Sequence, residues 1–166
     1  MTMSAHAVTL REITSETVRA VIKLSVAAEQ QGFVAPNAVS LAQALFSDEA
    51  WYRAVYAGEE LVGFVMLSDE TLKMPSAEPK IWLWRLMIDH KHQRRGIGRE
   101  VIRLALEYAR SRPGVRSFYT SYVPGPGGPE PFYLGLGFVP NGEVDEGEVV
   151  LVYPLHESAA TGGNSA

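Results

Sequence analysis

Hydrophobic and polar positions along the chain recur with two periods, one typical of strands and one typical of helices. Apolar runs that alternate, or that are apolar on both faces, predict strands. Within the run 80–89 only Arg85 interrupts the apolar interior, so we expect this strand in the middle of the sheet. One of its faces is expected to hold Trp82, Trp84, Leu86 and Ile88. The predicted strands cover 8–13, 51–57, 61–67, 80–89, 115–123, a segment that begins at Gly137-Phe138, and 148–155.

Apolar residues at helical spacing predict three helices and one shorter helical piece. Thr14 is the predicted N-cap of the first helix and Ser40 that of the second, because a hydroxyl oxygen accepts from an open amide of the first turn. The segment 32–37 separates these two helices as an apolar loop. The inward face of the first helix is expected to hold Val18, Val21, Ile22 and Val26. The other helical ranges are 41–47, 99–110 and 132–136, with loops over 90–98 and 124–131 and an acidic turn over 142–147.

The order of elements is strand, two helices, three strands, helix, strand, helix and two strands, which predicts one α/β (α+β) domain over 1–156. The segment 157–166 is mostly Ala, Gly, Ser, Thr and Asn and is expected to be a disordered tail. Residues 1–8 lack the basic flank and apolar stretch of a signal peptide, and no apolar run approaches the ~20 residues of a membrane span. We therefore expect a cytoplasmic protein without a membrane partner.

Composition removes several classes of function. The 166 residues include no cysteine, which excludes disulfides, thiolate metal sites, a cysteine nucleophile and an acyl-cysteine route. Nineteen acidic and fifteen basic side chains give a net charge of -4, so no global positive field is present to hold nucleic acid. A small cationic partner fits this balance better.

The segment 88–98 joins the central strand to a helix through a basic loop with two glycines. Gly96 and Gly98 allow close backbone approach to a ligand, while the open amides and positive dipole end of the helix favour an anion. The pattern is neither the three-glycine dinucleotide fingerprint nor the Gly-Lys-Ser phosphate loop, so nicotinamide cofactors and nucleoside triphosphates lose support. A solvated basic turn is the alternative. Arg94 and Arg95 in this segment, and Arg99 directly after it, add positive charge beside the glycines.

The residues 93–98, Gln-Arg-Arg-Gly-Ile-Gly, resemble the Gln/Arg-x-x-Gly-x-Gly signature of the GNAT acyl-CoA N-acyltransferases. In that family the signature follows the fourth strand, here 80–89, and a tyrosine recurs shortly before a Gly-Phe pair, here Tyr133 before 137–138. The resemblance covers about residues 8–155. It implies a central mixed, mostly antiparallel, twisted sheet of about seven strands, flanked by about four helices, with a V-shaped splay between the fourth and fifth strands.

The same resemblance implies acetyl-CoA as co-substrate, lying in the splay, and no metal. Its pyrophosphate would meet backbone amides from Arg94 to Gly98, and its pantetheine arm would pair with the backbone of Leu86 and Ile88. The cofactor-binding residues implied in this way are Leu86, Met87, Ile88, Gln93, Arg94, Arg95, Gly96, Ile97, Gly98, Arg99 and Tyr133.

Acetyl transfer to an amine requires a neutral amine beside the thioester, a donor for the developing oxyanion and a proton for the departing thiolate. A backbone N–H near Ile88 is the candidate oxyanion donor. The Tyr133 hydroxyl, carried over from the family motif, is the candidate acid that protonates or positions the thiolate. Aromatic packing of the short helix is the alternative role for this tyrosine.

A finer resemblance to the bacterial spermidine/diamine N-acetyltransferase branch lies in 29–37, 40–44, 81–89 and 147–150. A polyamine needs carboxylates for its ammonium groups and aromatic or apolar walls for its methylenes. The acidic run that includes Glu143, Asp145 and Glu146 is either a funnel for cations or a solvated turn. The predicted substrate-binding residues are Glu29, Phe33, Trp84, Arg85, Tyr122 and Glu148.

Two features depart from the family pattern. A cofactor-contacting asparagine that is common after the fifth strand aligns with Pro126, which puts that contact in doubt. The fourth strand carries no carboxylate base, so deprotonation would use water held by Glu29, Glu148 or a backbone carbonyl. Arg85 would orient or pair with an acid, unless it is simply an exposed or salt-bridged strand residue.

The two loop histidines, His90 and His92, are expected to be solvated rather than metal ligands, because the loop offers them no further ligand.

The favoured function is acetylation of a small primary amine, with polyamine or diamine preferred. Another amine, such as a protein N-terminus, lysine, amino acid or aminoglycoside, or a non-catalytic acyl-CoA sensor, remains open. A homodimer is expected, with the apolar run 149–153 as a candidate for pairing across a two-fold axis.

Overall fold

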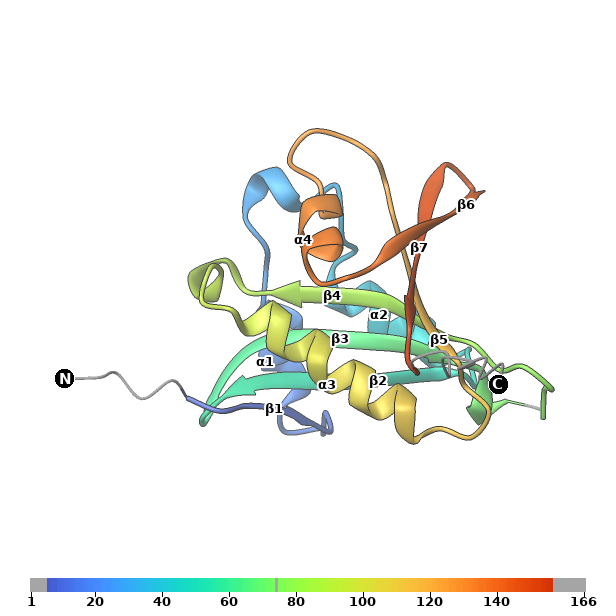
Figure 1. Ribbon diagram of the computed structural model, residues 1–166. Coiled ribbons are helices and arrows are strands. Elements are labelled where there is room, and N and C mark those ends of the chain that lie inside the picture. The colour runs from blue at the N-terminus through green and yellow to red at the C-terminus, as the bar shows by residue number, and fades with distance from the viewer. Residues whose placement is uncertain (1–5, 74, 157–166) are drawn as a thin grey trace, which may run out of the picture.

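Seven strands form one sheet at the centre of the protein, as the computed structural model shows (Figure 1). The structure describes residues 6–73 and 75–156, so the tail predicted at 157–166 lies outside the described residues. The strands are β1 (Val8–Arg11), β2 (Ala50–Ala57), β3 (Glu60–Asp69), β4 (Ile81–Ile88), β5 (Ser117–Tyr122), β6 (Val139–Asp145) and β7 (Glu148–Pro154). Their order in the sheet is β1-β2-β3-β4-β5-β7-β6, and every neighbouring pair is antiparallel except β4 and β5. The predicted mixed, mostly antiparallel sheet is confirmed.

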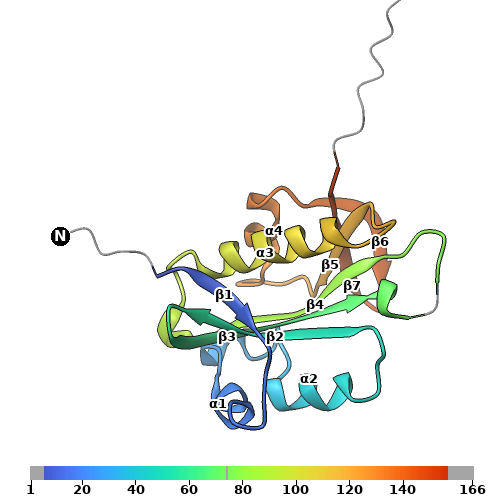
Figure 2. The same ribbon diagram turned by 90° about the horizontal axis from the view of Figure 1, so that it is seen from below.

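Helices cover both faces of this sheet, with α1 and α2 on one side and α3 on the other (Figure 2). The α-helices are α1 (Val18–Lys23), α2 (Asn37–Ala44), α3 (Ile97–Ser111) and α4 (Glu130–Gly135). Short 3-10 helices are η1 (Ala28–Gln30), η2 (Glu70–Leu72) and η3 (His90–His92). No helix in the described parts of the chain combines the length and apolar character that crossing a bilayer requires.

Each face of the sheet has its own apolar core. On one face α3 buries Val101, Ile102 and Ala105 against strand residues such as Val65 and Leu67. This stripe recurs every three or four residues, which is why the segment forms a half-buried helix. The core of the opposite face, packed against α1 and α2, comprises Val21, Ala54, Phe64, Met66 and Met87.

A β-bulge in β4 reverses which side chains share a face. Met66 of β3 pairs with Arg85, whereas its neighbour Leu67 pairs with Leu83, so Trp84 is an extra residue in β4. Leu86 therefore packs on the α3 side together with Leu83, while Trp84 packs on the α1 and α2 side. The prediction that Trp82, Trp84, Leu86 and Ile88 share one face is wrong, because simple alternation does not anticipate the inserted residue.

The two parallel strands separate soon after they meet. β4 and β5 pair only at Ile81 with Phe118 and at Trp82 with Tyr119. Beyond these pairs β5 continues beside β7, while β4 runs on beside β3. The predicted V-shaped splay between the fourth and fifth strands is confirmed, and it leaves one edge of β4 without a strand partner from Leu83 onward.

Both predicted helix caps are wrong. Residues 15–17 form a turn, and α1 begins at Val18, whose amide donates to the Thr14 carbonyl at 2.9 Å. In the second helix Ser40 is buried inside α2, which begins at Asn37 after Pro36. Pro36 precedes the helix in an extended conformation, and its carbonyl accepts a hydrogen bond from the Ser40 backbone amide at 3.2 Å.

Several other boundaries also differ from the prediction. Ile22 is 44% exposed rather than packed inward, because the six-residue α1 buries only Val21. The loop before α3 ends two residues earlier than predicted, at Gly96, whose φ of 76° is left-handed. The acidic turn is confined to Glu146 and Gly147, since β6 extends through Asp145.

The predicted pairing of the run 149–153 across a two-fold axis is also wrong, because β7 lies between β5 and β6. The sheet edge at this end is β6, whose residues are all exposed.

We expect Gly63→Ala to lower the free energy of unfolding by about 1–3 kcal/mol, a cost typical of overpacking. A Cβ at this position in β3 would lie 2.6 Å from the Met87 carbonyl oxygen and 2.8 Å from Cδ1 of Ile88. Urea denaturation of the variant and the wild type measures the difference. Gly125→Ala is the matched control, because its Cβ would have no neighbour within 4 Å, and it should change stability by less than about 0.5 kcal/mol. Equal stability of the two variants would contradict the close packing of β3 on β4.

Candidate active site

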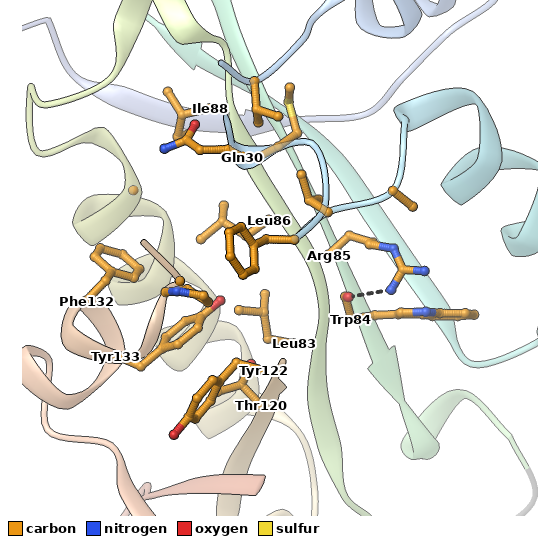
Figure 3. Close-up of a pocket in the computed structure, with 18 of the residues that line it drawn as sticks. Gln30, Leu83, Trp84, Arg85, Leu86, Ile88, Thr120, Tyr122, Phe132 and Tyr133 are labelled. Carbon is orange, nitrogen blue, oxygen red and sulfur yellow. Dashed lines mark hydrogen bonds between the residues drawn. The ribbon is translucent and has the colours of Figure 1, made fainter. Parts of the chain in front are cut away.

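A cleft of about 1150 Å³ opens where β4 and β5 separate (Figure 3). Its walls come from β4, β5, α4, the loop between η1 and α2, and the start of α3. Figure 3 shows Trp84 and Arg85 extending to one side of β4, with Tyr122 and Tyr133 on the other. The cleft therefore joins the two faces of the sheet through the gap between the strands.

One end of the cleft is the basic loop that precedes α3. Arg94 and Gly96 have left-handed backbone conformations, with φ of 63° and 76°, which turn the chain sharply into α3. The amide of Glu100 donates to the Gly96 carbonyl, so the preceding amides of 97–99 have no acceptor within the helix. Arg94 and Arg99 also line the cleft. Open amides, the helix dipole and two guanidinium groups together suit a diphosphate.

Asp89 fixes this loop to the sheet. Its carboxylate accepts from the Ser25 amide at 3.0 Å and the Lys91 amide at 3.1 Å, and its own amide donates to the Val62 carbonyl at 2.8 Å. Burial raises the pKa of Asp89, but the two amides, together with the charges of His90 and His92, outweigh burial and leave the pKa below its ordinary value. The ionised carboxylate thereby ties the α1–η1 connection to the start of the loop.

The free edge of β4 presents backbone groups to the cleft. Because the Asp89 amide bonds to β3, alternation turns the amide and carbonyl of Ile88 and Leu86 away from β3. The Ile88 carbonyl accepts from Nε2 of Gln93 at 2.9 Å, and the same Nε2 donates to Oε1 of Gln30 at 2.7 Å. Gln93 thus connects the β4 edge to η1 and leaves the Ile88 amide directed into the cleft.

Tyr133 projects from α4 toward β4 across the cleft (Figure 3). Its ring packs edge-on against Phe132 and Phe138, and only 8% of the residue is exposed. Burial raises the pKa of Tyr133 to about 12, although a hydrogen bond with the Thr120 side chain acts in the opposite direction. The hydroxyl therefore stays protonated near neutral pH and can donate a proton.

The other end of the cleft carries charged side chains. Arg85 is half-buried, and Glu148 accepts from the Ser121 hydroxyl at 2.7 Å. Glu49 lies there too, in an ion pair of 3.0 Å with Lys73. In Tyr122, burial first and the Glu130 carboxylate second raise the phenol pKa.

A sequence model described as the Acetyltransferase (GNAT) family matches residues 13–138, most of the chain. The chain belongs to this family. It is accordingly a GNAT acetyltransferase that uses acetyl-CoA as acyl donor.

Individual relatives agree with this assignment over nearly the full length. The chain is 26% identical to the spermine/spermidine N(1)-acetyltransferase of Bacillus subtilis (strain 168) over 156 residues, covering 89% of this chain and 99% of the relative. A crystal structure of an acetyltransferase from Thermus thermophilus superposes with a TM-score of 0.61 at 20% identity, covering 92% of this chain and 99% of that one. A GNAT family acetyltransferase from Elizabethkingia anophelis with acetyl-CoA bound has a TM-score of 0.62 at 14% identity, covering 89% and 97%.

The GNAT cleft brings most of the predicted site residues together and leaves two out. Glu29 lies in η1 and Arg95 in the loop before α3, but both are exposed and neither lines the cleft. Pro126 does not line it either, although Gly127, Gly128 and Pro129 do. The predicted residues that line it are Phe33, Trp84, Arg85, Leu86, Met87, Ile88, Gln93, Arg94, Gly96, Ile97, Gly98, Arg99, Tyr122, Tyr133 and Glu148.

Three of the lining residues that the sequence did not predict carry polar side chains whose placement matters for the site. Thr120 had a signal, since it is polar yet falls between Phe118 and Tyr122 on the inward face of β5. Gln30 is next to the predicted Glu29, but only the fold shows that Gln30, rather than Glu29, hydrogen-bonds to Gln93. Glu49 precedes β2 and carried no signal at all.

The histidines of the loop differ from each other. His90 is exposed, whereas the His92 side chain is 13% exposed, lines the cleft and lies 3.3 Å from Glu60, so the expectation of a solvated His92 is wrong. Within 6–73 and 75–156 no group of three or more His, Cys, Asp or Glu residues is arranged to hold a metal ion.

We expect Asp89→Asn to destabilise the protein by about 1–3 kcal/mol at pH 7, because the neutral amide side chain accepts more weakly than the carboxylate from the backbone amides of Ser25 and Lys91. The folded-state pKa of Asp89 is depressed, so its contribution is complete above the unfolded carboxyl pKa and is lost as pH falls through the lower folded value. The stability difference between variant and wild type, measured by urea denaturation, should therefore shrink below pH ~4. Asp145→Asn, on the exposed β6, is the control. A difference that persists unchanged at pH 3 would contradict the role of the ionised carboxylate.

Proposed function

We propose that this enzyme transfers an acetyl group from acetyl-CoA to the primary amine of a small substrate by direct attack in a ternary complex. The observation that carries the proposal is that one cleft is lined by the N-terminus of α3, the unpaired edge of β4 and the buried phenol of Tyr133. Acetyl-CoA supplies an activated acyl group and a thiolate leaving group. The remaining steps belong to side chains and amides of the protein.

Binding of the donor is assigned to the loop and the β4 edge. Backbone amides from Arg94 to Gly98 would hold the diphosphate, with Arg94 and Arg99 balancing its charge. The backbone of Leu86 and Ile88, which β5 leaves unpaired, would pair with the pantetheine amides as a further strand does. Arg95, which does not line the cleft, would contribute only long-range charge.

We assign two groups of the protein to the chemistry. The Ile88 amide would donate to the oxygen that gains negative charge when the amine attacks. The Tyr133 hydroxyl would then stabilise the departing thiolate by donating a hydrogen bond to it. Its raised pKa keeps the phenol protonated but opposes full proton transfer, which requires help from the geometry of the site. Attack also requires removal of a proton from the amine. Since β4 offers no carboxylate, water held by a backbone carbonyl of the cleft would accept this proton.

For the acceptor we propose a small amine of the diamine or polyamine class. Glu148 supplies a carboxylate for a second ammonium group, and Phe33, Trp84 and Tyr122 supply walls for methylenes. Similarity to a spermine/spermidine N(1)-acetyltransferase supports the same class. We further propose that residues 1–156 form the catalytic domain, that the enzyme is a homodimer and that it acts in the cytoplasm.

We expect Tyr133→Phe to lower kcat about 100-fold, with the KM for acetyl-CoA changed less than threefold, because the variant loses only the proton donor. Release of free thiol is followed with spermidine, spermine, a diamine, lysine and a peptide as acceptors. With a pKa of about 12, Tyr133 should produce no falling limb in the wild-type pH–rate profile below pH ~10.

Tyr56→Phe is the matched control, since Tyr56 lies under Arg11 on β2, outside the cleft, and should retain full activity. Unchanged kcat in Tyr133→Phe would contradict the acid role. Preference for the peptide would contradict a small-amine acceptor, and acetyl-CoA binding without turnover on any amine would favour an acyl-CoA sensor.

A further inference from the structure

Arg85 occupies the acceptor end of the cleft with most of its hydrogen-bonding capacity unused. A guanidinium has five N–H donors. Here Nη1 donates to the Trp84 carbonyl at 3.0 Å (Figure 3). Nη2 donates to Oε1 of Gln43 at 3.4 Å, while the buried Nε has no partner. Two hydrogen bonds to neutral acceptors are few for a half-buried cation.

Arg85 also has no ion-pair partner among the residues that the structure describes. No carboxylate of the described ranges lies within 4.0 Å of its guanidinium, in contrast to five other arginine ion pairs, including the one between Arg53 and Glu12. Burial lowers the pKa of Arg85, and the more distant Glu148 only partly offsets this effect. Charge burial without a partner is costly, and an anion from a ligand would relieve the cost.

The acidic groups of this end differ in their availability to a ligand. Glu49 is already neutralised by Lys73 at 3.0 Å. Glu148 is held by the neutral Ser121 hydroxyl and has no ion pair among the described residues. The acceptor end thus offers one cation, Arg85, and one anion, Glu148, that are near each other without being in contact.

We propose that the acceptor carries a carboxylate, bound by Arg85, in addition to an ammonium group bound by Glu148. Such an acceptor is a diamino acid whose distal primary amine is acetylated. Arg85 binds the carboxylate through a charge-assisted hydrogen bond from a free N–H, and Trp84 and Phe33 contact the methylene chain. This inference rests on the proposed function and narrows its substrate class from diamines in general to diamines with a carboxylate.

The test compares acceptors that differ only in the carboxylate. Lysine and 1,5-diaminopentane form one such pair, and ornithine and 1,4-diaminobutane form another. Initial rates of thiol release give kcat/KM for each, with spermidine as a third reference. In parallel, calorimetry measures binding of the same amines to the protein saturated with coenzyme A, which requires no turnover.

Two variants assign the preference to Arg85. In Arg85→Gln the charge is lost, whereas Arg85→Lys keeps it without the planar fork. Arg53→Gln is the matched control. Arg53 likewise donates from Nη1 to the carbonyl of the preceding residue, at 2.7 Å, but it lies on β2 outside the cleft and pairs with Glu12. Thermal unfolding and the Kd for acetyl-CoA verify that each variant is folded.

We expect wild type to prefer the amino acid of each pair by at least about tenfold in kcat/KM. Arg85→Gln should abolish that preference, mainly by raising KM for the amino acid, whereas Arg53→Gln should leave the preference and the diamine rates unchanged. Arg85→Lys should restore part of it. Equal or better use of diamines or spermidine by wild type would overturn the inference while leaving the proposed function intact. Absence of turnover on every amine would overturn the proposed function. In that case the calorimetric Kd values of each amino acid and its matching diamine would test the carboxylate site, since a tenfold preference for the amino acid is again expected and equal affinities would overturn the inference.

Discussion

The separation of β4 from β5 is the constraint on which the rest of the structure depends. After two residue pairs the strands diverge, and one edge of a central strand is left without a backbone partner. Unpaired backbone groups in a sheet interior are costly unless something else satisfies them. Within the protein, Gln93 satisfies the Ile88 carbonyl, and the remaining groups face a cleft of about 1150 Å³. The unpaired strand edge and the proposed site of catalysis are therefore the same feature.

The surrounding elements hold this gap in a fixed shape. The bulge at Trp84 lets β4 present Leu86 to the α3 core while Trp84 and Met87 close the opposite face. Asp89 then anchors the turn into the basic loop before α3, and the α4 helix packs Tyr133 against Phe138 on the far wall. The loop proposed to bind the donor, the proposed oxyanion donor and the proposed acid consequently lie on three different elements, which all pack on the core of the α3 face.

The sequence predicted the element order and the basic loop between the central strand and α3, because each rests on a local pattern, whereas the mixed sheet and its splay followed from the family resemblance. It did not predict the side-chain orientation of β4, since the extra residue at Trp84 becomes visible only through its pairing with β3. Thr14 and Ser40 failed as caps for a related reason: a hydroxyl before an apolar run is also found in turns and helix interiors. Arg85 was recognised, but the absence of a carboxylate beside it depends on tertiary placement.

The most direct test of the account is amide hydrogen exchange with and without acetyl-CoA. Binding to the β4 edge and the start of α3 predicts slower exchange in 86–88 and 94–99, with α2 unchanged. Equal exchange in both segments at saturating acetyl-CoA, or protection confined to other parts of the chain, would contradict the assignment of this cleft as the donor site.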